Sequence, residues 1–264
     1  MKSLLGIDLP FYSYGILMGI AFILAVFLFK FNSKRNLANK PPLLDIFLII
    51  SIFGVIGARI NYIILFPQYF DSIGECLAIH KGGLVFYGGF IAAVLALYIY
   101  CKIKKYSFAM VADYMVPSLA IGHSLGRVGC LINDCCYGTR TNLIRIYYLK
   151  NDPFRFFRHP TQLYEIIYLI ILAVVFTFVL RSDWQEKKGN SGLVAVSYVI
   201  AYSFFRFLNE FLRADDRGGF YTLFKLSPAQ ITSIILVICG ILFLINRKIM
   251  NKKAYSEDKN DGRN

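Results

Sequence analysis

One predicted helix carries several ionisable or polar side chains along a single face. Tyr202, Arg206 and Glu210 follow one another at intervals of four residues. Arg213 comes three residues after the glutamate. Residues three and four apart share a helix face, so a phenol, a carboxylate and two guanidiniums form one stripe. The stripe either binds an ionic ligand, with Glu210 orienting Arg206 or acting as a base, or forms an ion-paired contact with a neighbouring helix.

Two further arginines, Arg59 and Arg127, also lie inside apolar runs. An arginine at the centre of a membrane helix costs about 2.5–3.5 kcal/mol on insertion scales, and such residues usually serve a function. A guanidinium binds phosphate through two parallel hydrogen bonds and keeps its charge in a medium of low dielectric constant. We therefore expect Arg59, Arg127 and Arg206 to lie at one depth and to bind a phospholipid phosphate.

Two more features of the apolar runs carry open interpretations. His123 stands four residues before Arg127, which suits either the same site or a hydrogen-bonded histidine within a helix bundle. Tyr87 stands among the glycines Gly82, Gly83, Gly88 and Gly89. These glycines allow either close approach of a ligand to the backbone or tight packing of helices.

The composition indicates the elements that hold these residues. The chain has 264 residues, of which 57% are hydrophobic and 17% charged, and its mean hydropathy is +0.55. Soluble domains carry about 25% charged residues, so the fold class expected is an all-α, polytopic membrane protein. The net charge of +13 would suggest nucleic acid in a soluble protein. Here the bias of Lys and Arg toward cytoplasmic loops explains it, and no nucleic-acid partner is expected.

Seven apolar runs are near the length that crosses a bilayer. They are Tyr12 to Phe31, Leu43 to Leu65, Gly82 to Cys101, Phe108 to Asn133, Gln162 to Leu180, Ser191 to Leu212 and Gln230 to Asn246. The sequence predicts one transmembrane domain over residues 1–246, and no pattern of a cleaved signal peptide precedes it. Residues 247–264 are expected to be a polar cytoplasmic tail, frayed or disordered.

The distribution of Lys and Arg predicts the orientation. Sixteen of these residues lie in the connections on one side and nine on the other. The richer side should be cytoplasmic, which places the amino terminus outside and the carboxyl terminus inside. The arginines of the apolar runs then fall in the outer half of the membrane. The basic loop 134–161 is the exception, because it faces outward; there it either lies near anionic headgroups or is a longer loop that tolerates charge.

The run from Gly126 to Gly138 reads GRVGCLINDCCYG and resembles the signature of the prolipoprotein diacylglyceryl transferase family. The resemblance covers most of the chain. Its other parts are Gly57-Ala58-Arg59, the segment Gly82 to Gly89, Asp113, the segment His159 to Glu165, and the set Tyr202, Arg206, Glu210, Phe211 and Arg213.

The resemblance implies a seven-helix enzyme that transfers a diacylglyceryl group from phosphatidylglycerol to the lipobox cysteine of a preprolipoprotein. It implies a place in the bacterial cytoplasmic (inner) membrane, with membrane lipids and preprolipoprotein signal peptides as partners. Catalytic roles would fall to Arg127, Arg206, Glu210 and Tyr87, with the two arginines on the departing phosphate. Substrate-binding roles would fall to Arg127, Asn133, Tyr202, Tyr14, Arg59, Gly88 and Gly138. Neither a metal nor an organic cofactor is expected.

The chain departs from the family pattern at three positions. The family usually has histidine where Tyr87 stands, asparagine at Cys130 and glutamate at Cys135. A neutral phenol is a poor base at neutral pH because its pKa is about 10. Two alternatives therefore stay open: a related transferase with another donor or acceptor, and a transporter or lipid-binding protein without chemistry. Transporters often show inverted repeats and place sites at the midplane of the bilayer, and the sequence shows neither.

Three cysteines gather within seven residues, at Cys130, Cys135 and Cys136. Their spacing is not a standard zinc pattern. In an oxidising exterior, Cys130 could form a disulfide with Cys135 or Cys136, or Cys76 could pair with one of them. A packing role and a thiol that transiently accepts a lipid group are the other interpretations.

Overall fold

The computed structural model describes residues 13–33, 42–70, 72–78, 83–143, 156–182, 190–214 and 226–261. The chain divides into two compact units, which are described separately. The first contains residues 1–32 and 112–264, and the second contains residues 33–111. That residues 1–246 form one domain stays a prediction.

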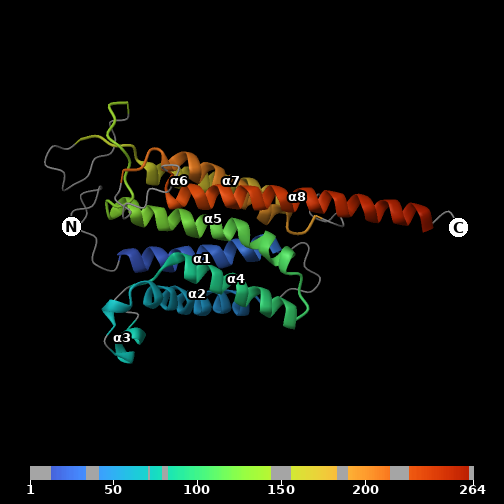
Figure 1. Cartoon of the computed structure of the whole chain (residues 1–264), viewed down its shortest axis with the longest axis horizontal. Coiled ribbons are helices and arrows are strands. Elements are labelled where there is room, and N and C mark those ends of the chain that lie inside the picture. Colours follow the sequence, from blue (N-terminus) through green and yellow to red (C-terminus); the bar gives the residue numbers. More distant parts are fainter. Residues whose placement is uncertain are drawn as a thin grey trace. The chain divides into compact units, whose positions relative to one another are not determined.

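The described residues form helices, as the sequence predicted. They are α1 (Ser13–Ser33), α2 (Leu43–Leu65), the 3-10 helix η1 (Pro67–Tyr69), α3 (Ile73–Leu77), α4 (Phe86–Ile103), α5 (Phe108–Ile132), α6 (Thr161–Arg181), α7 (Leu193–Glu210) and α8 (Pro228–Asp261) (Figure 1). Within the described ranges, β pairing is limited to the isolated bridges Gly138–Arg213 and Arg140–Arg158. The all-α class is confirmed.

Among the described residues, five helices are long and apolar enough to cross a membrane. They are Gly15–Ser33, Leu43–Leu65, Phe108–Ile132, Thr161–Arg181 and Pro228–Met250. The apolar stretch of α4, Gly88–Ile103, is shorter, and α7 is made more polar by its charged carboxyl-terminal turn. Many large apolar side chains of these helices are exposed, for example Ile23 at 67% and Phe178 at 72%. Such surfaces suit contact with lipid, so the chain is a multi-pass membrane protein.

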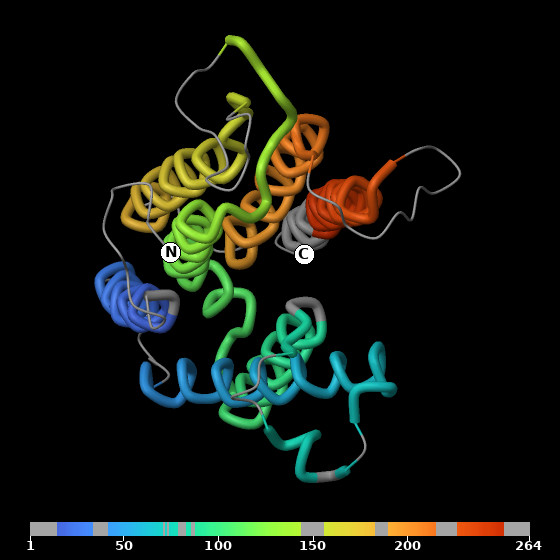
Figure 2. The backbone as a smooth tube through the Cα atoms, turned by 90° about the vertical axis from the view of Figure 1, so that its left-hand side faces the viewer, coloured from blue at the N-terminus to red at the C-terminus, as the bar shows by residue number. Residues whose placement is uncertain are grey.

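In the first unit, α6, α7 and α8 pack side by side (Figures 1 and 2). The ring of Tyr168 stacks on that of Phe205, with centroids 4.1 Å apart, and its hydroxyl donates to the carbonyl of Ala201 at 2.7 Å. Gly240 of α8 faces Ile200 of α7 so closely that an added Cβ would lie 2.6 Å from that side chain. Small residues at such contacts let membrane helices approach each other.

Asp113 fixes the start of α7. Its buried carboxylate accepts hydrogen bonds from the backbone N–H of Gly192 at 2.6 Å and of Ala195 at 2.8 Å. The first N–H groups of a helix have no partner within the helix, and their positive dipole end favours an anion. Asp113 therefore holds the beginning of α7, and this places Arg206 and Glu210 at the opposite end.

In the second unit, α2 and α4 pack through glycines. A Cβ added to Gly88 would collide with Asn61, and one added to Gly57 would collide with Ala92. Substrate binding by Gly88 stays a prediction, whereas the tight helix packing considered for the glycines around Tyr87 is what the structure shows for Gly88 and Gly89; Gly82 lies outside the described residues.

Helix α8 does not end near Asn246. It continues to Asp261, so the expectation of a frayed or disordered tail from Arg247 is wrong up to that residue (Figure 1). The reason lies in composition, because the run from Lys248 to Asp261 contains four lysines and no glycine or proline, and lysine favours helices.

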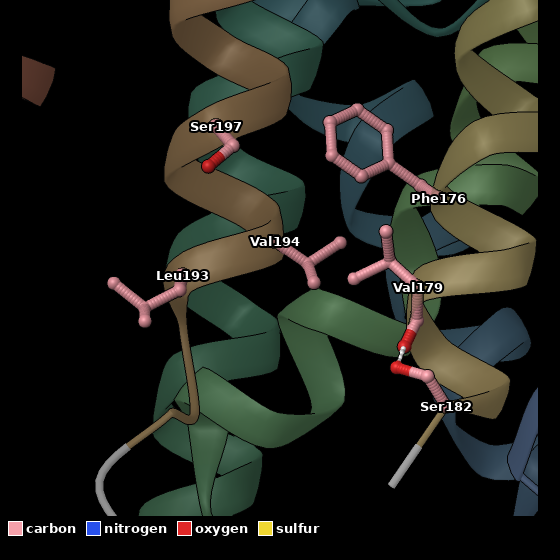
Figure 3. Close-up of a pocket in the computed structure, with 6 residues that line it drawn as sticks. All are labelled: Phe176, Val179, Ser182, Leu193, Val194 and Ser197. Carbon is pink, nitrogen blue, oxygen red and sulfur yellow. Dashed lines mark hydrogen bonds between the residues drawn. The ribbon is translucent and has the colours of Figure 1, made fainter. Parts of the chain in front are cut away.

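A cavity of about 330 Å³ lies between the last turns of α6 and the first turns of α7 (Figure 3). Its lining is mostly apolar and consists of Phe176, Val179, Ser182, Leu193, Val194 and Ser197. These residues lie at the ends of α6 and α7 that are remote from Arg206. This cavity therefore does not belong to the cluster of charged side chains around Arg206 and Glu210.

Candidate active site

The site is built where α5 ends, α6 begins and α7 ends. The segment after α5 runs along the ends of the other two helices (Figure 2). The backbone N–H of Gly138 donates to the carbonyl of His159 at 3.1 Å, and that of Thr139 donates to the carbonyl of Leu212 at 2.7 Å. A Cβ added to Gly138 would lie 2.5 Å from the His159 oxygen. Only glycine fits there, so the role that the structure shows for Gly138 is to let the backbone of this segment pass close to His159 and Leu212.

Glu165 of α6 is the centre of the cluster. Its side chain is fully buried and lies 3.1 Å from Nε of Arg127 and 3.6 Å from Nε2 of His123. The hydroxyl of Tyr202 donates to Glu165 Oε1 at 2.7 Å. One carboxylate therefore joins side chains of α5, α6 and α7.

Glu165 was missed as a site residue by the sequence analysis. Its sequence context nevertheless contained a signal for such a role. It is the one charged side chain between Thr161 and Leu180 of α6. A lone carboxylate inside an apolar helix needs a buried partner, and Arg127 is that partner.

Arg206 and Glu210 of α7 form a second group with Arg213, which lies in the turn after α7 and not on the helix as the spacing predicted. Nη1 of Arg206 lies 2.6 Å from Oε2 of Glu210, and Nε of Arg213 lies 3.7 Å from the same oxygen. The three side chains are less than one-tenth exposed. Two guanidiniums thus share one carboxylate, which leaves this group with a net positive charge.

The two groups are neighbours. The charges of both Arg127 and Arg206 act on the carboxylate of Glu165, and both act on His123. A hydrogen bond also links the two groups, because Tyr202, which donates to Glu165, lies one turn before Arg206 on α7. That Arg127 and Arg206 bind one phosphate together stays a prediction. The catalytic roles of Arg127, Arg206 and Glu210 stay predictions, as does the substrate-binding role of Tyr202.

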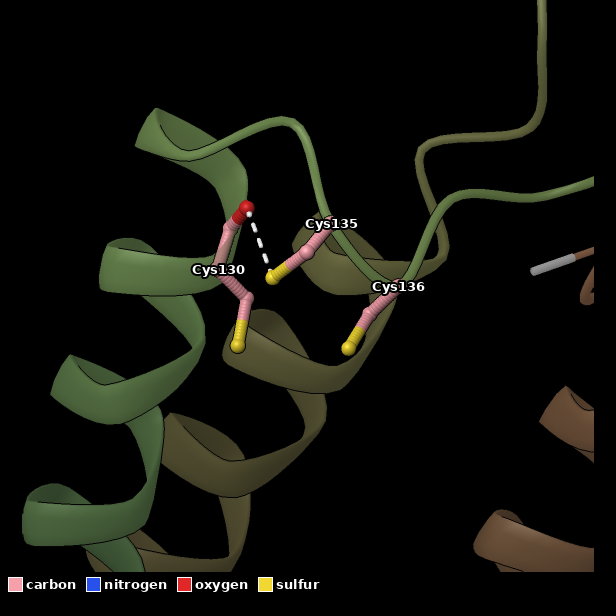
Figure 4. A group of neighbouring side chains, drawn as sticks. All are labelled: Cys130, Cys135 and Cys136. Atoms are coloured by element: carbon pink, nitrogen blue, oxygen red, sulfur yellow. Dashed lines mark hydrogen bonds between the residues drawn. The ribbon is translucent and has the colours of Figure 1, made fainter. Parts of the chain in front are cut away.

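Three thiols, those of Cys130, Cys135 and Cys136, lie close together at the end of α5 and in the turn beyond it (Figure 4). Nη1 of Arg127 lies 3.8 Å from the sulfur of Cys136. Hydrogen bonds with the thiols of Cys130 and Cys135, together with the Arg213 guanidinium, hold the pKa of Cys136 well below its ordinary value. All six cysteines of the chain are free in the structure, so none of the disulfides considered from the sequence is present.

Arg59 lies in the second unit and is held by backbone carbonyls. Its Nε donates to Cys76 at 2.9 Å, its Nη1 to Gly83 at 3.1 Å and its Nη2 to Glu75 at 2.6 Å. The guanidinium also lies over the ring of Phe70, 5.0 Å from its centroid. These contacts tether the segment between α2 and α4, and a contact of Arg59 with phosphate stays a prediction.

The remaining expected residues are placed as follows. Asn133 is exposed at the end of α5. The side chains of Tyr14 and Tyr87 lie outside the described part of the structure, so their proposed roles stay predictions. Within the described residues, the group of side chains close enough together to hold a metal ion consists of the thiols of Cys130, Cys135 and Cys136.

Comparison with known proteins shows the family of this chain. The family model described as prolipoprotein diacylglyceryl transferase matches residues 2–246. The chain is 34% identical to a phosphatidylglycerol–prolipoprotein diacylglyceryl transferase of Clostridium tetani over 244 residues, which cover 90% of this chain and 94% of the relative. It is 34% identical to the enzyme of the same name from Finegoldia magna over 249 residues, which cover 93% and 94%. The match spans both units, the signature after Gly126 and the charged stripe of α7, and the chain belongs to the prolipoprotein diacylglyceryl transferase family.

Proposed function

We propose that this protein transfers a diacylglyceryl group from phosphatidylglycerol to the lipobox cysteine thiol of preprolipoproteins. The acceptor sulfur attacks the carbon of the diacylated glycerol that is bonded to the phosphate ester oxygen. The carbon–oxygen bond breaks and glycerol phosphate leaves with the bonding pair. The thiol proton passes to a base.

The observation that carries the proposal is the ion pair of Arg127 with Glu165, which Tyr202 links by a hydrogen bond to α7 one turn before Arg206. A departing phosphate gains negative charge, and guanidiniums fixed in a site of low dielectric constant stabilise developing charge without reorganisation. Arg213 adds a third guanidinium at the carboxylate of Glu210. The cluster therefore suits a phosphate leaving group better than a neutral ligand.

The two carboxylates have different roles in this proposal. Glu165 is fully buried between Arg127 and Tyr202, so it positions the arginine. Glu210 orients Arg206 and Arg213, and it is one candidate for the base. Tyr87 is the other candidate, and Tyr87→His in the transfer assay tests it: an unchanged rate would exclude this position as the base.

The remaining substrate contacts are assigned by the family resemblance. Asn133 would lie near the lipid headgroup and Tyr14 would line the cavity. Arg59, Gly88 and Gly138 complete the predicted binding set. The partners are phosphatidylglycerol, preprolipoprotein signal peptides and membrane lipids.

The proposal places the site in the outer half of the bacterial cytoplasmic (inner) membrane. Helices α1, α2 and α4 to α8 would be the seven spans, with the amino terminus outside and the carboxyl terminus in the cytoplasm. The excess of Lys and Arg in the connections on the side of the carboxyl terminus supports this orientation. Tagging each end with a reporter that is active in only one compartment tests it.

The direct test is transfer by the purified, full-length protein. Vesicles of phosphatidylglycerol and a peptide with a lipobox cysteine are incubated with the protein, and the peptide is weighed by mass spectrometry. The proposal expects a gain of one diacylglyceryl group on the thiol and release of glycerol phosphate. A peptide with serine in place of the cysteine is the control. Absence of any gain with phosphatidylglycerol would reject this donor and acceptor pair.

A further inference from the structure

The trio Cys130, Cys135 and Cys136 has the arrangement of a chelating site. Cys130 lies in the last turn of α5, and the other two follow in the turn beyond it (Figure 4). Their sulfur atoms all lie within 4.8 Å of one another. Cys135 is exposed and the other two are half-buried, so an ion from solvent can reach the sulfurs.

A disulfide between the adjacent residues Cys135 and Cys136 fits the geometry poorly, and no disulfide is present among the three. Adjacent Cα atoms are about 3.8 Å apart across a trans peptide, whereas disulfides join Cα atoms about 4.4–6.8 Å apart. Cys135 and Cys136 are adjacent in sequence, and no cis peptide occurs in the described residues. The thiol of Cys135 is turned toward the carbonyl of Cys130 at 3.6 Å. A bond between any one pair would also leave the third thiol unused.

The turn is held in place by its surroundings. Thr161 donates to the carbonyl of Cys136 at 2.7 Å, and Gln162 donates to that of Cys135 at 2.6 Å. Cys136 has a φ of 62°, a left-handed conformation that costs a non-glycine residue about 1–2 kcal/mol. The fold sustains this conformation and, with it, the convergence of the three sulfurs.

The neighbouring charges suit bound thiolates. Three thiolates on a divalent ion leave a net charge of −1. Nη1 of Arg127 lies 3.8 Å from the sulfur of Cys136, and the charge of Arg213 also acts on that thiol. Partners in the shell around the ligands commonly orient them and tune the site. Here two guanidiniums would compensate the excess negative charge.

We propose that Cys130, Cys135 and Cys136 bind one soft metal cation, Zn²⁺, through three thiolates. Thiolate ligands select Zn²⁺ and Cu⁺ over harder ions. Each thiol that binds releases its proton to water, and no atom changes oxidation state. The ion would tie the end of α5 to the turn before α6, beside Arg127. This site is additional to the transfer reaction and does not depend on it.

The test uses purified full-length protein in detergent, reduced and kept free of oxygen. Cd²⁺ serves as a spectroscopic probe, because cadmium thiolates absorb in the ultraviolet, and Zn²⁺ is titrated against a coloured chelator. One ion per chain is expected. Cys130→Ser, Cys135→Ser and Cys136→Ser should each weaken Zn²⁺ binding by at least about tenfold, since loss of partners around a metal site alone costs 10–100-fold. Cys239→Ser, on exposed α8, is the matched control and should bind as the unmodified protein does.

A second measurement needs no variant. Alkylation of the unmodified protein is followed by mass spectrometry with Zn²⁺ or with Mg²⁺. Zn²⁺ should protect the three thiols at least about tenfold, while Mg²⁺, which prefers oxygen ligands, should not. Equal alkylation under both conditions, or a cadmium signal that survives replacement of all three cysteines, would overturn the proposal.

Discussion

The carboxylate of Glu165 lies 3.1 Å from Nε of Arg127, although the two residues are on different helices and separated by the loop after α5. The carboxylate is fully buried. An ion pair of this kind holds a guanidinium in a defined place, which is what a phosphate-binding residue requires.

Glu165→Ala should destabilise the protein. The change leaves the guanidinium of Arg127 buried without its partner, and breaking a buried pair costs about 3–5 kcal/mol. Thermal unfolding in nanodiscs measures the effect. The double variant Arg127→Ala/Glu165→Ala should lose less than the sum of the single variants, by about 0.5–3 kcal/mol. Additive losses would mean that the two residues do not act as a pair.

Tyr202→Phe removes the hydroxyl that donates to Glu165 at 2.7 Å. A hydrogen bond to a charged group contributes about 1.5–3 kcal/mol, so the rate of transfer should fall by about tenfold or more. Steady-state transfer to a lipobox peptide measures it. Tyr198→Phe is the matched control one turn earlier, because its ring stacks on that of Tyr202. An equal loss in both variants would argue against a specific role for the Tyr202 hydroxyl.

Asp113→Ala should affect stability rather than chemistry. It removes the anion that accepts from the N–H groups of Gly192 and Ala195, and loss of such a cap costs about 1–2 kcal/mol. The melting temperature should fall, while the rate of transfer per folded molecule stays near that of the unmodified protein. A normal melting temperature with lost activity would contradict the structural role given to Asp113.

Gly88→Ala should destabilise the packing of α2 against α4. The new methyl group would collide with Asn61, and overpacking costs about 1–3 kcal/mol. Gly19→Ala is the control, since nothing lies within 4 Å of the position its Cβ would take. Thermal unfolding of both variants separates a packing effect from a general effect of the substitution; equal stability of the two would remove the packing argument.

The sequence predicted those features that are local in the chain. The ion pair of Arg206 with Glu210 follows from their spacing on one helix, and the structure contains it. Arg213 lies beyond the end of α7, yet its Nε lies 3.7 Å from the same carboxylate. The role of Glu165 was not predictable in the same way, because its partners Arg127 and Tyr202 are on other helices. The spacing of residues within one helix does not show which neighbouring helix will pack against a given face.

Arg59 illustrates the same limit. Its position in an apolar run suggested a phosphate ligand, yet its donors reach the carbonyls of Glu75, Cys76 and Gly83. The sequence does not show that the backbone of a later segment folds back onto this arginine and accepts the hydrogen bonds of its guanidinium. The extent of α8 was also misjudged, since a polar run rich in helix-forming residues continues an apolar helix beyond the membrane-length segment.

The central claim is that Arg127 and Arg206 together bind the departing phosphate. The most direct measurement is the rate of diacylglyceryl transfer by Arg127→Ala and Arg206→Ala, with the amount of correctly inserted protein measured in parallel. Arg181→Ala is the control, because its guanidinium lies over Phe31 in the first unit, at the opposite end of α6. The account predicts a loss of about 10- to 100-fold in each of the first two variants, from charge-assisted hydrogen bonds worth about 1.5–3 kcal/mol, and near-normal transfer in the control. Transfer at the unmodified rate by both Arg127→Ala and Arg206→Ala would contradict it.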